Sequence, residues 1–351
     1  VMIGTVDVLI RNYEEVCRKN KLPCYANKKS VNVFSSKFSF RKVCKKFGFK
    51  EIPDYTHYLK KKKLLPDKLF PVIIKPVDSG GGVGATLCRS NYEIYKALKN
   101  AKKFSKTNSV LCQDYFLEDD VQLYFTIINK KVYLSSVNDR FTTKIQKKNA
   151  PVCIGANYNS KYLKLILKKY YKKFNKLIDY LKIDNGILSI QCFVKNNELY
   201  PYDPGFRLQG EGNNLVLNKI NKFDHLDMLL DLSLGKPFFL GDFKKTNDPY
   251  LKKNYVSSVW ILLKKGIINK IYNLDKIKKH KCFLDIIQRF KLKDKIKSSF
   301  IGTEKQVFAR IYLASKKKTE LINAINYIHK KLKILDNNNN DLILDKYVRT
   351  K

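Results

Sequence analysis

Residues 70–88 constrain the fold of this 351-residue chain more than any other stretch. Residues 72–74, Val-Ile-Ile, are apolar and β-branched, which suits a buried strand, and Lys75 follows at the strand's end. Four glycines then stand among residues 80–84. A loop without Cβ atoms lets several backbone N–H groups approach one anion closely. Because residues 85–88 return to an extended pattern, the stretch predicts two strands joined by a glycine flap.

The order of residues in this stretch excludes two other phosphate-binding motifs. A P-loop closes its glycine run with Gly-Lys-Ser/Thr and enters a helix at once, whereas Val83-Gly84-Ala85 stands here. A dinucleotide fingerprint needs GxGxxG at the start of a helix, and this run has neither that spacing nor that helix. A glycine flap between two strands, with a lysine before it, is typical of a lid over a triphosphate. A flexible surface hairpin explains the stretch equally well, so both interpretations stay open at this point.

The chain is strongly basic, with 70 Lys and Arg against 31 Asp and Glu and a net charge of +39. Such a charge can indicate binding to nucleic acid or to an anionic membrane. However, the lysines are spread over nearly every predicted helix, and no RRM, KH, helix-turn-helix or zinc-finger pattern occurs. We therefore interpret the charge as a solubilising surface, with nucleic-acid binding as the minor alternative.

Length and composition predict a globular protein of two or three domains, because 44% of its residues are hydrophobic and Gly and Pro are few. None of the eight cysteines forms a CxxC motif, and the histidines are not clustered near them. This spacing argues against a zinc site and a disulfide framework and fits a reducing cytosol. No apolar run reaches membrane-spanning length and no signal peptide is visible, so we expect a cytoplasmic protein without membrane contact.

Periodicity and turn residues predict a mixed order of helices and strands. Strands are expected at residues 1–7, 72–74, 85–88, 110–116, 121–128, 131–137, 186–194, 198–203, 256–262, 266–271 and 306–313. Helices are expected at residues 8–20, from about 37 to 47, 91–104, 161–182, 223–234 and 319–332. A capping box at residues 90–93 opens the third of these helices. Residues 141–160 are expected to be irregular, and a short final strand follows residues 337–340.

Lys37 lies in the first turn of a predicted helix that Ser35 or Ser36 can cap. A cation in that turn is unfavourable for the helix dipole. The lysine therefore more plausibly reaches toward a phosphate than stabilises the helix. A solvated surface lysine is the alternative.

Gln191 and Asp203 are polar residues on two neighbouring predicted strands. A two-residue loop at residues 196–197 would put them on opposite faces, whereas a three-residue loop at residues 196–198 would set them directly across from each other. We predict the three-residue loop, or a bulge with the same effect. A two-residue turn without a bulge would remove the pair.

Arg207 follows Asp203 in the segment Pro-Gly-Phe-Arg-Leu-Gln-Gly of residues 204–210. An arginine bracketed by Pro and Gly, beside a carboxylate at the end of a strand, indicates an ordered loop at an active site. Its guanidinium offers a fixed fork of donors suited to phosphate or carboxylate. A structural ion pair is the alternative.

The candidate residues, in their order along the chain, resemble the pattern of the ATP-grasp superfamily. They are Lys37, Lys75, the glycine flap, residues 113–120, Gln191, Asp203 and Arg207. The resemblance is to its carboxylate–amine ligase branch, which is related to carbamoyl-phosphate synthase and L-amino-acid ligases. It covers nearly the whole chain and implies a fold of two α+β lobes that clamp ATP. Residues 1–35 would be the tail of an N-terminal Rossmann-like domain, 36–66 linker helices, 67–118 the small lobe, 119–247 the large lobe and 248–351 a C-terminal α+β lobe. Because the early strands of the first domain are missing, one expectation is a fragment of a longer chain.

The resemblance also implies a role for each candidate residue in binding ATP. Lys37 and Lys75 look like the two lysines that contact the α- and β-phosphates. The flap over the β- and γ-phosphates would be formed by Ser79, Gly80, Gly81 and Gly82. The hinge whose backbone binds adenine would be formed by Gln113, Asp114, Tyr115 and Phe116. Asp120 looks like the carboxylate that binds ribose, where Glu is usual.

For the metal and the chemistry, the resemblance assigns Mg²⁺, with Mn²⁺ as an alternative ion, to Gln191 and Asp203. Arg207 and Lys75 are the expected catalytic residues, and Arg140 is a weaker candidate for recognition of a substrate carboxylate. Two departures reduce the metal site. Gln191 replaces a usual Glu, and Gly205 replaces a usual metal-binding Asn. One carboxylate remains where two are expected, which is still enough for one Mg²⁺ bound together with phosphates.

The expected activity is that of an ATP-dependent ligase. A substrate carboxylate would be activated as an acyl phosphate and attacked by an amine to form a C–N bond, with release of ADP and phosphate. The expected partners are therefore small-molecule carboxylates and amines, and a homodimer is expected because relatives are often dimers. The alternative is a nucleotide-binding protein with little or no turnover because of the depleted metal site. A basic nucleic-acid-binding protein is the third candidate. The sequence does not identify the acid or the amine.

Overall fold

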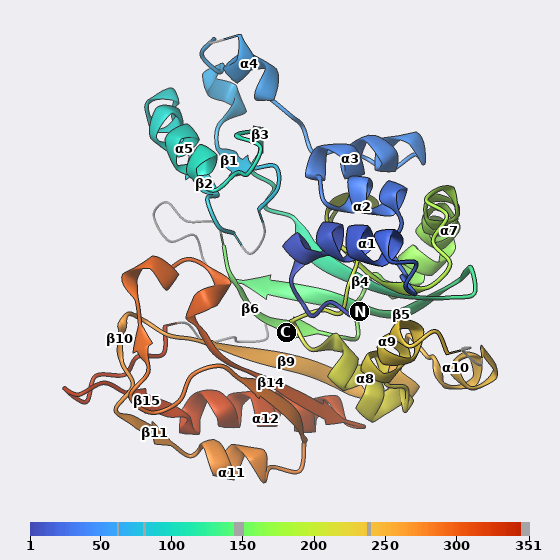
Figure 1. The fold of residues 1–351 in the computed structure, drawn as a ribbon. Helices are drawn as coiled ribbons and strands as arrows, with labels where there is room; N and C mark the ends of the chain where they lie inside the picture. The colour runs from blue at the N-terminus through green and yellow to red at the C-terminus, as the bar shows by residue number, and fades with distance from the viewer. Residues whose placement is uncertain (62, 80–81, 144–150, 237–239, 345–351) are drawn as a thin grey trace. The chain divides into compact units, whose positions relative to one another are not determined.

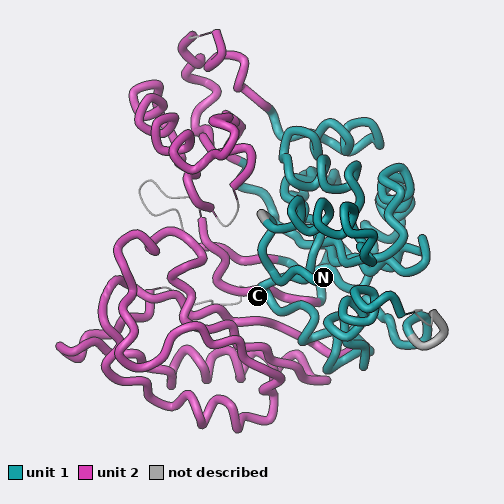
Figure 2. The backbone as a smooth tube through the Cα atoms, in the orientation of Figure 1, with its two compact units in different colours: residues 1–53, 116–139, 159–252 teal, residues 54–115, 140–158, 253–351 magenta. Residues whose placement is uncertain are grey.

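The computed structural model describes residues 1–61, 63–79, 82–143, 151–236 and 240–344 (Figure 1). The chain forms two compact units, each assembled from three segments that are distant in sequence (Figure 2). Unit 1 contains residues 1–53, 116–139 and 159–252, and unit 2 contains residues 54–115, 140–158 and 253–351. Both units combine helices with antiparallel strands, so the mixed α+β class expected from the sequence is confirmed.

Unit 1 is built on neighbouring strands in the order β5-β4-β7-β8. These are β4 (Asp119–Ile128), β5 (Lys131–Thr142), β7 (Gly186–Lys195) and β8 (Glu198–Gly205). Successive side chains of a strand point to opposite faces, so Leu123 and Phe125 lie on one face of β4 while Gln122 and Tyr124 lie on the other. The antiparallel register places Gln122 opposite Gln191 of β7. One face of these strands is therefore apolar and the other carries polar side chains.

Helices of unit 1 bury the apolar face. Phe174 of α7 (Tyr171–Tyr180) is fully buried, with its ring centroid 5.1 Å from Phe125 and 4.6 Å from Phe49. Each buried side chain of this kind contributes about 1.5–3 kcal/mol to folding. The helical stretch predicted at 161–182 is confirmed, although it consists of α6 (Leu163–Leu165), a π-helical turn η3 (Ile166–Tyr170) and α7.

The other helices of unit 1 lie near the chain start and after β8. They are α1 (Ile10–Lys19), α2 (Lys28–Phe34), α3 (Lys37–Lys46), α8 (Asn213–Asn221), α9 (His225–Ser233) and α10 (Leu240–Thr246), with 3-10 turns η1 (Asp7–Leu9) and η4 (Leu251–Lys253). The helices predicted before residue 20 and up to residue 47 are confirmed. The strand predicted at residues 1–7 is wrong. A strand needs a hydrogen-bonding neighbour, and no described strand pairs with these residues; Asp7 instead begins the turn that leads into α1.

Unit 2 begins with a three-stranded sheet in the order β2-β1-β3. Its elements are β1 (Val72–Pro76), β2 (Thr86–Cys88), β3 (Val110–Asp114) and the covering helix α5 (Asn91–Lys103), preceded by α4 (Thr56–Lys60) and η2 (Asp67–Leu69). Val72 and Ile74 are buried against Ile94, Ala97 and Ala101 of α5. Because β1 and β2 pair antiparallel, the predicted strand, loop and strand arrangement is confirmed.

The rest of unit 2 contains strands in the order β12-β14-β9-β6. They are β6 (Cys153–Asn157), β9 (Tyr255–Leu262), β12 (Phe283–Gln288) and β14 (Val307–Ser315), and α12 (Lys318–Lys331) packs on β9 and β14. Leu321, Ala324, Ile325 and Ile328 of α12 are buried because their spacing places them on one side of the helix. The remaining elements are β10 (Gly266–Ile267), β11 (Lys270–Tyr272), α11 (Leu274–Lys278), β13 (Lys295–Ile296), η5 (Ser298–Phe300), η6 (Glu304–Gln306) and β15 (Lys333–Leu335).

Two expectations for unit 2 are corrected. The single strand predicted at residues 266–271 is wrong, because β10 pairs with β13 while β11 pairs with β15. The backbone N–H of Ile268 donates to Asp294 O between these two pairings, at 3.0 Å. The irregular stretch predicted up to residue 160 contains β6, all of whose residues are buried. Residues 144–150 of that stretch lie outside the described residues.

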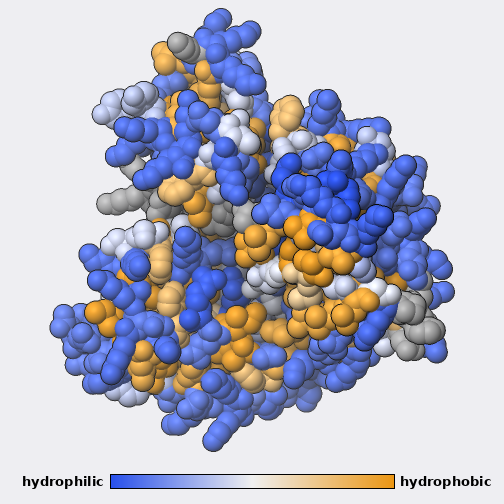
Figure 3. Space-filling model, in the orientation of Figure 1, coloured by the Kyte–Doolittle hydropathy of each residue, from blue (hydrophilic) through white to orange (hydrophobic). Residues whose placement is uncertain are grey.

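The surface follows the composition. Hydrophilic residues cover most of the visible face, with apolar residues between them (Figure 3). Within the part of the chain that is described, none of the helices is both long and apolar enough to cross a lipid bilayer.

Candidate functional site

The hairpin of β7 and β8 decides whether Gln191 and Asp203 can act together. Its turn has two residues, Asn196 and Asn197, both with positive φ, so the three-residue loop is wrong. The alternative prediction of a bulge is confirmed. Cys192 pairs with Pro201, but Gln191 pairs with Asp203, which leaves Tyr202 as an extra residue in β8. Gln191 and Asp203 are therefore directly opposite each other on neighbouring strands.

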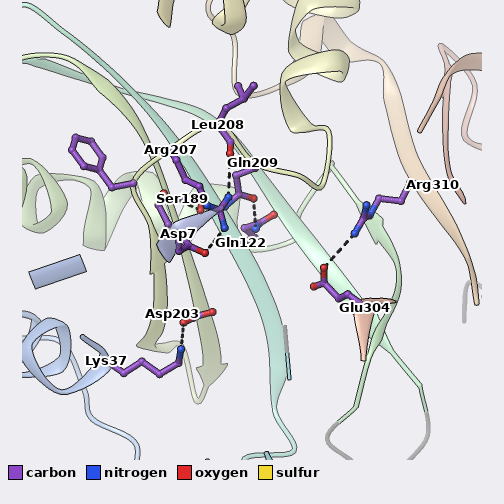
Figure 4. A network of polar contacts seen from close by, with 12 residues as sticks. Asp7, Lys37, Gln122, Ser189, Asp203, Arg207, Leu208, Gln209, Glu304 and Arg310 are labelled. Carbon is purple, nitrogen blue, oxygen red and sulfur yellow. Dashed lines mark hydrogen bonds and ion pairs between the residues drawn. The ribbon is translucent and has the colours of Figure 1, made fainter. Parts of the chain in front are cut away.

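Lys37 lies beside this pair. Its Nζ is 2.7 Å from Oδ1 of Asp203, and only 14% of its side chain is exposed (Figure 4). Helix α3 begins at Lys37 because Ser36 is its N-cap, and Ser36 Oγ accepts from the backbone N–H of Ser39 at 3.3 Å. The lysine is thus held at a helix start against a carboxylate of β8. It is not a solvated surface lysine.

Arg207 stands just after β8, where its guanidinium forms an ion pair with Asp7 of the N-terminal turn η1 (Figure 4). Arg207 Nη1 also donates to Leu208 O at 3.1 Å. Its Nε is buried and has no hydrogen-bond partner among the described residues. The structure therefore contains the ion pair that was the alternative interpretation, but half of the side chain of Asp7 is exposed. A carboxylate from solution could take the place of Asp7.

Asp120 joins Gln191 through a residue that the sequence reasoning missed. The Tyr202 hydroxyl lies 3.0 Å from Asp120 Oδ1 and 2.9 Å from Gln191 Oε1. The Tyr202 ring is stacked on Phe193 at 4.5 Å, and Phe193 is the β7 residue paired with Asp120. Strict alternation along β8 would have turned Tyr202 away from Asp203. The bulge that changes this is one of the two alternatives that the sequence offers, but nothing in the sequence singles out Tyr202 as the extra residue.

A chain of buried amides holds the loop that carries Arg207 against the strands. Asn138 Nδ2 donates to Asn213 at 3.2 Å, Asn213 Nδ2 donates to Gln122 at 3.1 Å, and Gln122 Nε2 donates to Gln209 at 2.7 Å. All four amide residues are buried. Buried polar groups that satisfy one another favour a single arrangement of their segments. These contacts fix residues 209–213 to β4 and β5.

Gly205 is closely surrounded by polar groups. A Cβ at this position would lie 3.0 Å from Ser189 Oγ and 3.4 Å from Gln209 Nε2. Asp7 Oδ1 lies 3.6 Å from the same point. A side chain at this position would therefore begin in close contact with Ser189 and in ordinary contact with Gln209 and Asp7.

The remaining phosphate candidates belong to unit 2. Lys75 lies in β1 opposite Leu111 and is half-buried. Ser79 Oγ donates to Val83 O at 3.1 Å, which closes the loop after β1. Gly82 has a φ of +76°, a value that side chains disfavour. Gly80 and Gly81 lie outside the described residues.

The predicted hinge, residues 113–116, is where the chain passes from unit 2 to unit 1. Gln113 is buried in β3, and its Nε2 has no hydrogen-bond partner among the described residues. Asp114 ends β3, and Tyr115 N–H donates to Pro71 O at 3.2 Å. Phe116 enters unit 1, where its ring lies 5.5 Å from Phe193. Arg140 is half-buried in the last part of β5, in unit 2.

The donors available for a metal are few. Among the described residues, no three His, Cys, Asp or Glu side chains come together as a metal site. Asp203 and Gln191 can offer one carboxylate and one amide carbonyl. Mg²⁺ commonly keeps several ligands from phosphate and water, so this donor set fits an ion that arrives with a nucleotide.

A second charged cluster lies in unit 2, where the sequence suggested no chemistry. Arg310 is buried over the ring of Trp260, at 4.3 Å, and its Nη2 is 3.3 Å from Glu304 Oε2 (Figure 4). Arg289 Nη1 donates to Glu304 O at 2.6 Å. An arginine inside an apolar strand, as in residues 307–313, was the available signal.

Comparison with known proteins shows which sequences and folds this chain is similar to. No family model matches the chain. A formate-dependent phosphoribosylglycinamide formyltransferase from Wolinella succinogenes is 27% identical over 148 residues, which cover 39% of this chain and 36% of that protein. The match thus spans about a third of the length of that curated relative.

Solved structures match over nearly the whole chain. The L-amino acid ligase of Bacillus licheniformis superposes with a TM-score of 0.77 at 14% identity, covering 95% of this chain and 80% of its own. Phosphoribosylglycinamide synthetase of Anaerococcus prevotii gives 0.66 at 15% identity, with 95% and 81% covered. The biotin carboxylase domain of Hydrogenobacter thermophilus 2-oxoglutarate carboxylase, solved with MgADP and bicarbonate, gives 0.71 at 14% identity, with 93% and 72% covered. At these identities the matches show a shared fold.

Proposed function

We propose that this chain, which has the ATP-grasp fold, is an ATP- and Mg²⁺-dependent ligase that joins a small-molecule carboxylate to an amine. One observation carries the proposal. Lys37, from a distant segment of unit 1, lies 2.7 Å from Asp203, which faces Gln191 across the β7–β8 hairpin, and Arg207 follows two residues after β8. The structural relatives include an L-amino acid ligase and a phosphoribosylglycinamide synthetase, which supports this reaction class.

In this proposal Asp203 and Gln191 would hold one Mg²⁺, or Mn²⁺ as an alternative, together with phosphate oxygens of ATP. When bound, the ion neutralises charge on those phosphates. In this structure Lys37 forms an ion pair with the carboxylate of Asp203. We therefore propose that Lys37 leaves this carboxylate and binds phosphate when the nucleotide and the ion bind. The Lys37–Asp203 ion pair thus keeps both groups ordered before the nucleotide arrives.

Arg207 and Lys75 are the proposed catalytic residues. Arg207 would exchange Asp7 for the substrate carboxylate and the phosphoryl group, since its fork of donors suits either. The carboxylate oxygen attacks the γ-phosphorus, the bond to the β-γ bridging oxygen breaks, and ADP leaves. The amine then attacks the acyl carbon, phosphate leaves, and the amine nitrogen loses a proton. The protein contributes position and positive charge, as is usual in phosphoryl transfer.

The nucleoside and the flap complete the proposed site. Asp120 would bind the ribose hydroxyls, and residues 113–116 would bind adenine through their backbone. Phe116 and Phe193 offer aromatic rings beside Asp120. Residues 79–82 would close over the phosphates and exclude water, which protects the acyl phosphate from hydrolysis. Arg140 remains a weaker candidate for carboxylate recognition.

The wider organisation is also proposed on this basis. We propose the lobe boundaries given above, with residues 67–118 as the small lobe, 119–247 as the large lobe and 248–351 as the C-terminal lobe. A cytoplasmic location fits eight cysteines that are all free thiols. A homodimer remains part of the proposal.

A nucleotide-binding protein without turnover is the second candidate, and Gly205 favours it. Gly205 offers no side chain to a second metal ion, and a Cβ there would already lie 3.0 Å from Ser189 Oγ. The experiment that separates the two candidates measures ADP and phosphate release with MgATP and a panel of amino acids, hydroxy acids and amines. Release that depends on an acid and an amine supports the ligase. Tight ATP binding without release under any combination supports the inert binder, and absence of ATP binding overturns both.

A further inference from the structure

The bulged residue Tyr202 makes a contact that neither strand pattern predicts. Its single hydroxyl lies within hydrogen-bond distance of Asp120 Oδ1 and Gln191 Oε1. These two residues are the proposed ribose ligand and one of the two proposed metal ligands. A single atom therefore connects two parts of the site that have different tasks.

The number of protons at this contact is informative. A tyrosine hydroxyl has one proton to donate, and an ionised carboxylate can only accept. If the proton goes to Asp120, the oxygen of Gln191 would face the tyrosine oxygen without a donor between them. Turning the Gln191 amide by half a rotation places Nε2 beside Tyr202. Nε2–H then donates to the hydroxyl, the hydroxyl donates to Asp120, and no two acceptors face each other at this contact.

This turn changes what Gln191 offers to a cation. The amide oxygen moves into the place of the nitrogen and away from Tyr202, on a residue whose partner across the strand pair is Asp203. Mg²⁺ takes oxygen ligands, whereas an amide nitrogen carries hydrogens and does not ligate it. The direction of one hydrogen-bond chain thus decides whether Gln191 can serve as a metal ligand.

Tyr202 is well held for this task. Its ring stacks on Phe193 at 4.5 Å and 19°, and Phe193 packs on Phe116 at 5.5 Å. The three rings run from the proposed adenine hinge to the proposed metal ligands. Because the ring is fixed, its hydroxyl remains beside Asp120 and Gln191.

We propose that Tyr202 is a positioning residue that couples sugar recognition to cation binding. Its hydroxyl orients the carboxylate of Asp120 toward ribose and turns the carbonyl of Gln191 toward the cation. This inference rests on the proposed function, because it assumes that ATP and Mg²⁺ bind at this site. By orienting the carbonyl of Gln191, the tyrosine would provide part of the affinity for the cation that a second carboxylate would provide through its charge.

The test uses Tyr202→Phe, which keeps the stacked ring and removes only the hydroxyl. Calorimetry on the full chain would give Kd for ATP and for 2′,3′-dideoxy-ATP, each with Mg²⁺ and with EDTA. For the unaltered protein we expect preferences for the ribose hydroxyls and for Mg²⁺. In Tyr202→Phe both preferences should fall together, each by about tenfold or more, as for loss of a hydrogen bond to a charged group. Tyr95→Phe, on the exposed side of α5, should change neither.

A second variant separates positioning from structural support. In Gln191→Glu both ends of the side chain are oxygens, so no turn is needed to ligate a cation. Adding Tyr202→Phe to Gln191→Glu should leave the Mg²⁺ preference unchanged while still reducing the preference for ribose. A purely structural role would weaken both preferences again, and that result would overturn the inference.

The failures of the two proposals can be told apart. If the unaltered protein binds no ATP, the proposed function fails and this inference falls with it. If it binds ATP with both preferences and Tyr202→Phe retains them at an unchanged melting temperature, only the role of Tyr202 is refuted.

Discussion

At the scale of single residues, Lys37 shows how a locally unfavourable choice is compensated by the fold. A cation in the first turn of α3 opposes the helix dipole, but Asp203 of β8 lies 2.7 Å away. The same carboxylate is the only acidic group in the proposed pair of metal ligands. Its charge therefore forms an ion pair with Lys37 in the free protein and would bind a cation in the proposed nucleotide complex.

Replacing Asp203 tests this double use. We expect Asp203→Asn to weaken MgATP binding by at least about tenfold, because the only negative ligand is lost. Binding of ATP in EDTA should change much less, since the substitution removes an ion pair that competes with phosphate for Lys37. Calorimetry with and without Mg²⁺ measures both. Asp231→Asn, which removes a surface ion pair with Lys236, should leave both affinities unchanged; equal losses in the two media would contradict the assignment.

His225 gives a second prediction at this scale. Its Nε2 is 2.8 Å from Thr126 Oγ1, its Nδ1 is buried without a partner among the described residues, and burial lowers its pKa to about 3. The unfolded chain has the ordinary histidine pKa of about 6.5. Between these two values the unfolded state binds a proton that the folded state does not, so stability falls as the pH drops below about 6.5, by up to about 1.4 kcal/mol per pH unit.

Urea unfolding at several pH values between about 4 and 7 would measure this slope. His225→Gln should reduce the slope of the unfolding free energy against pH by the contribution of about one proton. His57→Gln, on an exposed part of α4, should leave the slope unchanged. Identical slopes for all three proteins would show that His225 is not kept neutral by burial.

At the scale of elements, the flap is anchored by the glycine at its end. Gly84 has a φ of +76°, and a Cβ there would lie 2.9 Å from Pro76 Cγ and 3.1 Å from Phe104 Cβ. The strand β1, the flap and the loop after α5 therefore meet at a point where only glycine fits. Pro76 is close to Gly84 in the sequence, whereas Phe104 lies on the far side of β2 and α5, so only the contact with Pro76 is local.

We expect Gly84→Ala to lower the free energy of unfolding by about 1–3 kcal/mol, since it adds both strain and a clash. Chemical denaturation measures the change. Gly4→Ala is the matched control, because no heavy atom lies within 4 Å of its Cβ position, and it should change stability by less than about 0.5 kcal/mol. Equal effects at the two positions would contradict the packing described here.

At the scale of the whole molecule, the net charge of +39 is the dominant property. Hydrophilic side chains are spread over the visible surface (Figure 3), which fits the interpretation of a solubilising charge. Such a surface attracts polyanions at low salt without recognising their sequence.

We therefore expect single-stranded DNA to bind weakly and to lose about 10³-fold in affinity between about 50 mM and 200 mM salt. Affinity for MgATP should fall by less than about tenfold over the same range, because the contacts proposed for it are few and partly buried. Fluorescence anisotropy with two unrelated DNA sequences measures the first effect and calorimetry the second. Tight, sequence-dependent DNA binding at physiological salt would restore the nucleic-acid alternative.

Much of the architecture could be predicted because its causes are local. Alternation along β4, the glycine run after β1 and the serine before α3 each depend on residues within a few positions of one another. The failures arise where a neighbour distant in sequence decides. Residues 1–7 have strand-like composition, yet no described strand pairs with them, and residues 266–271 split because two different partners lie beside them.

By itself, the sequence determined the mixed class, the strand and flap arrangement and the order of the polar residues that resemble an ATP-grasp site. Only the tertiary structure decided that Tyr202 is bulged, that Asp7 faces Arg207 and that Lys37 faces Asp203. The reason is physical. Side-chain periodicity follows from the geometry of one strand or helix, whereas register and ion pairing depend on which distant segment packs beside it.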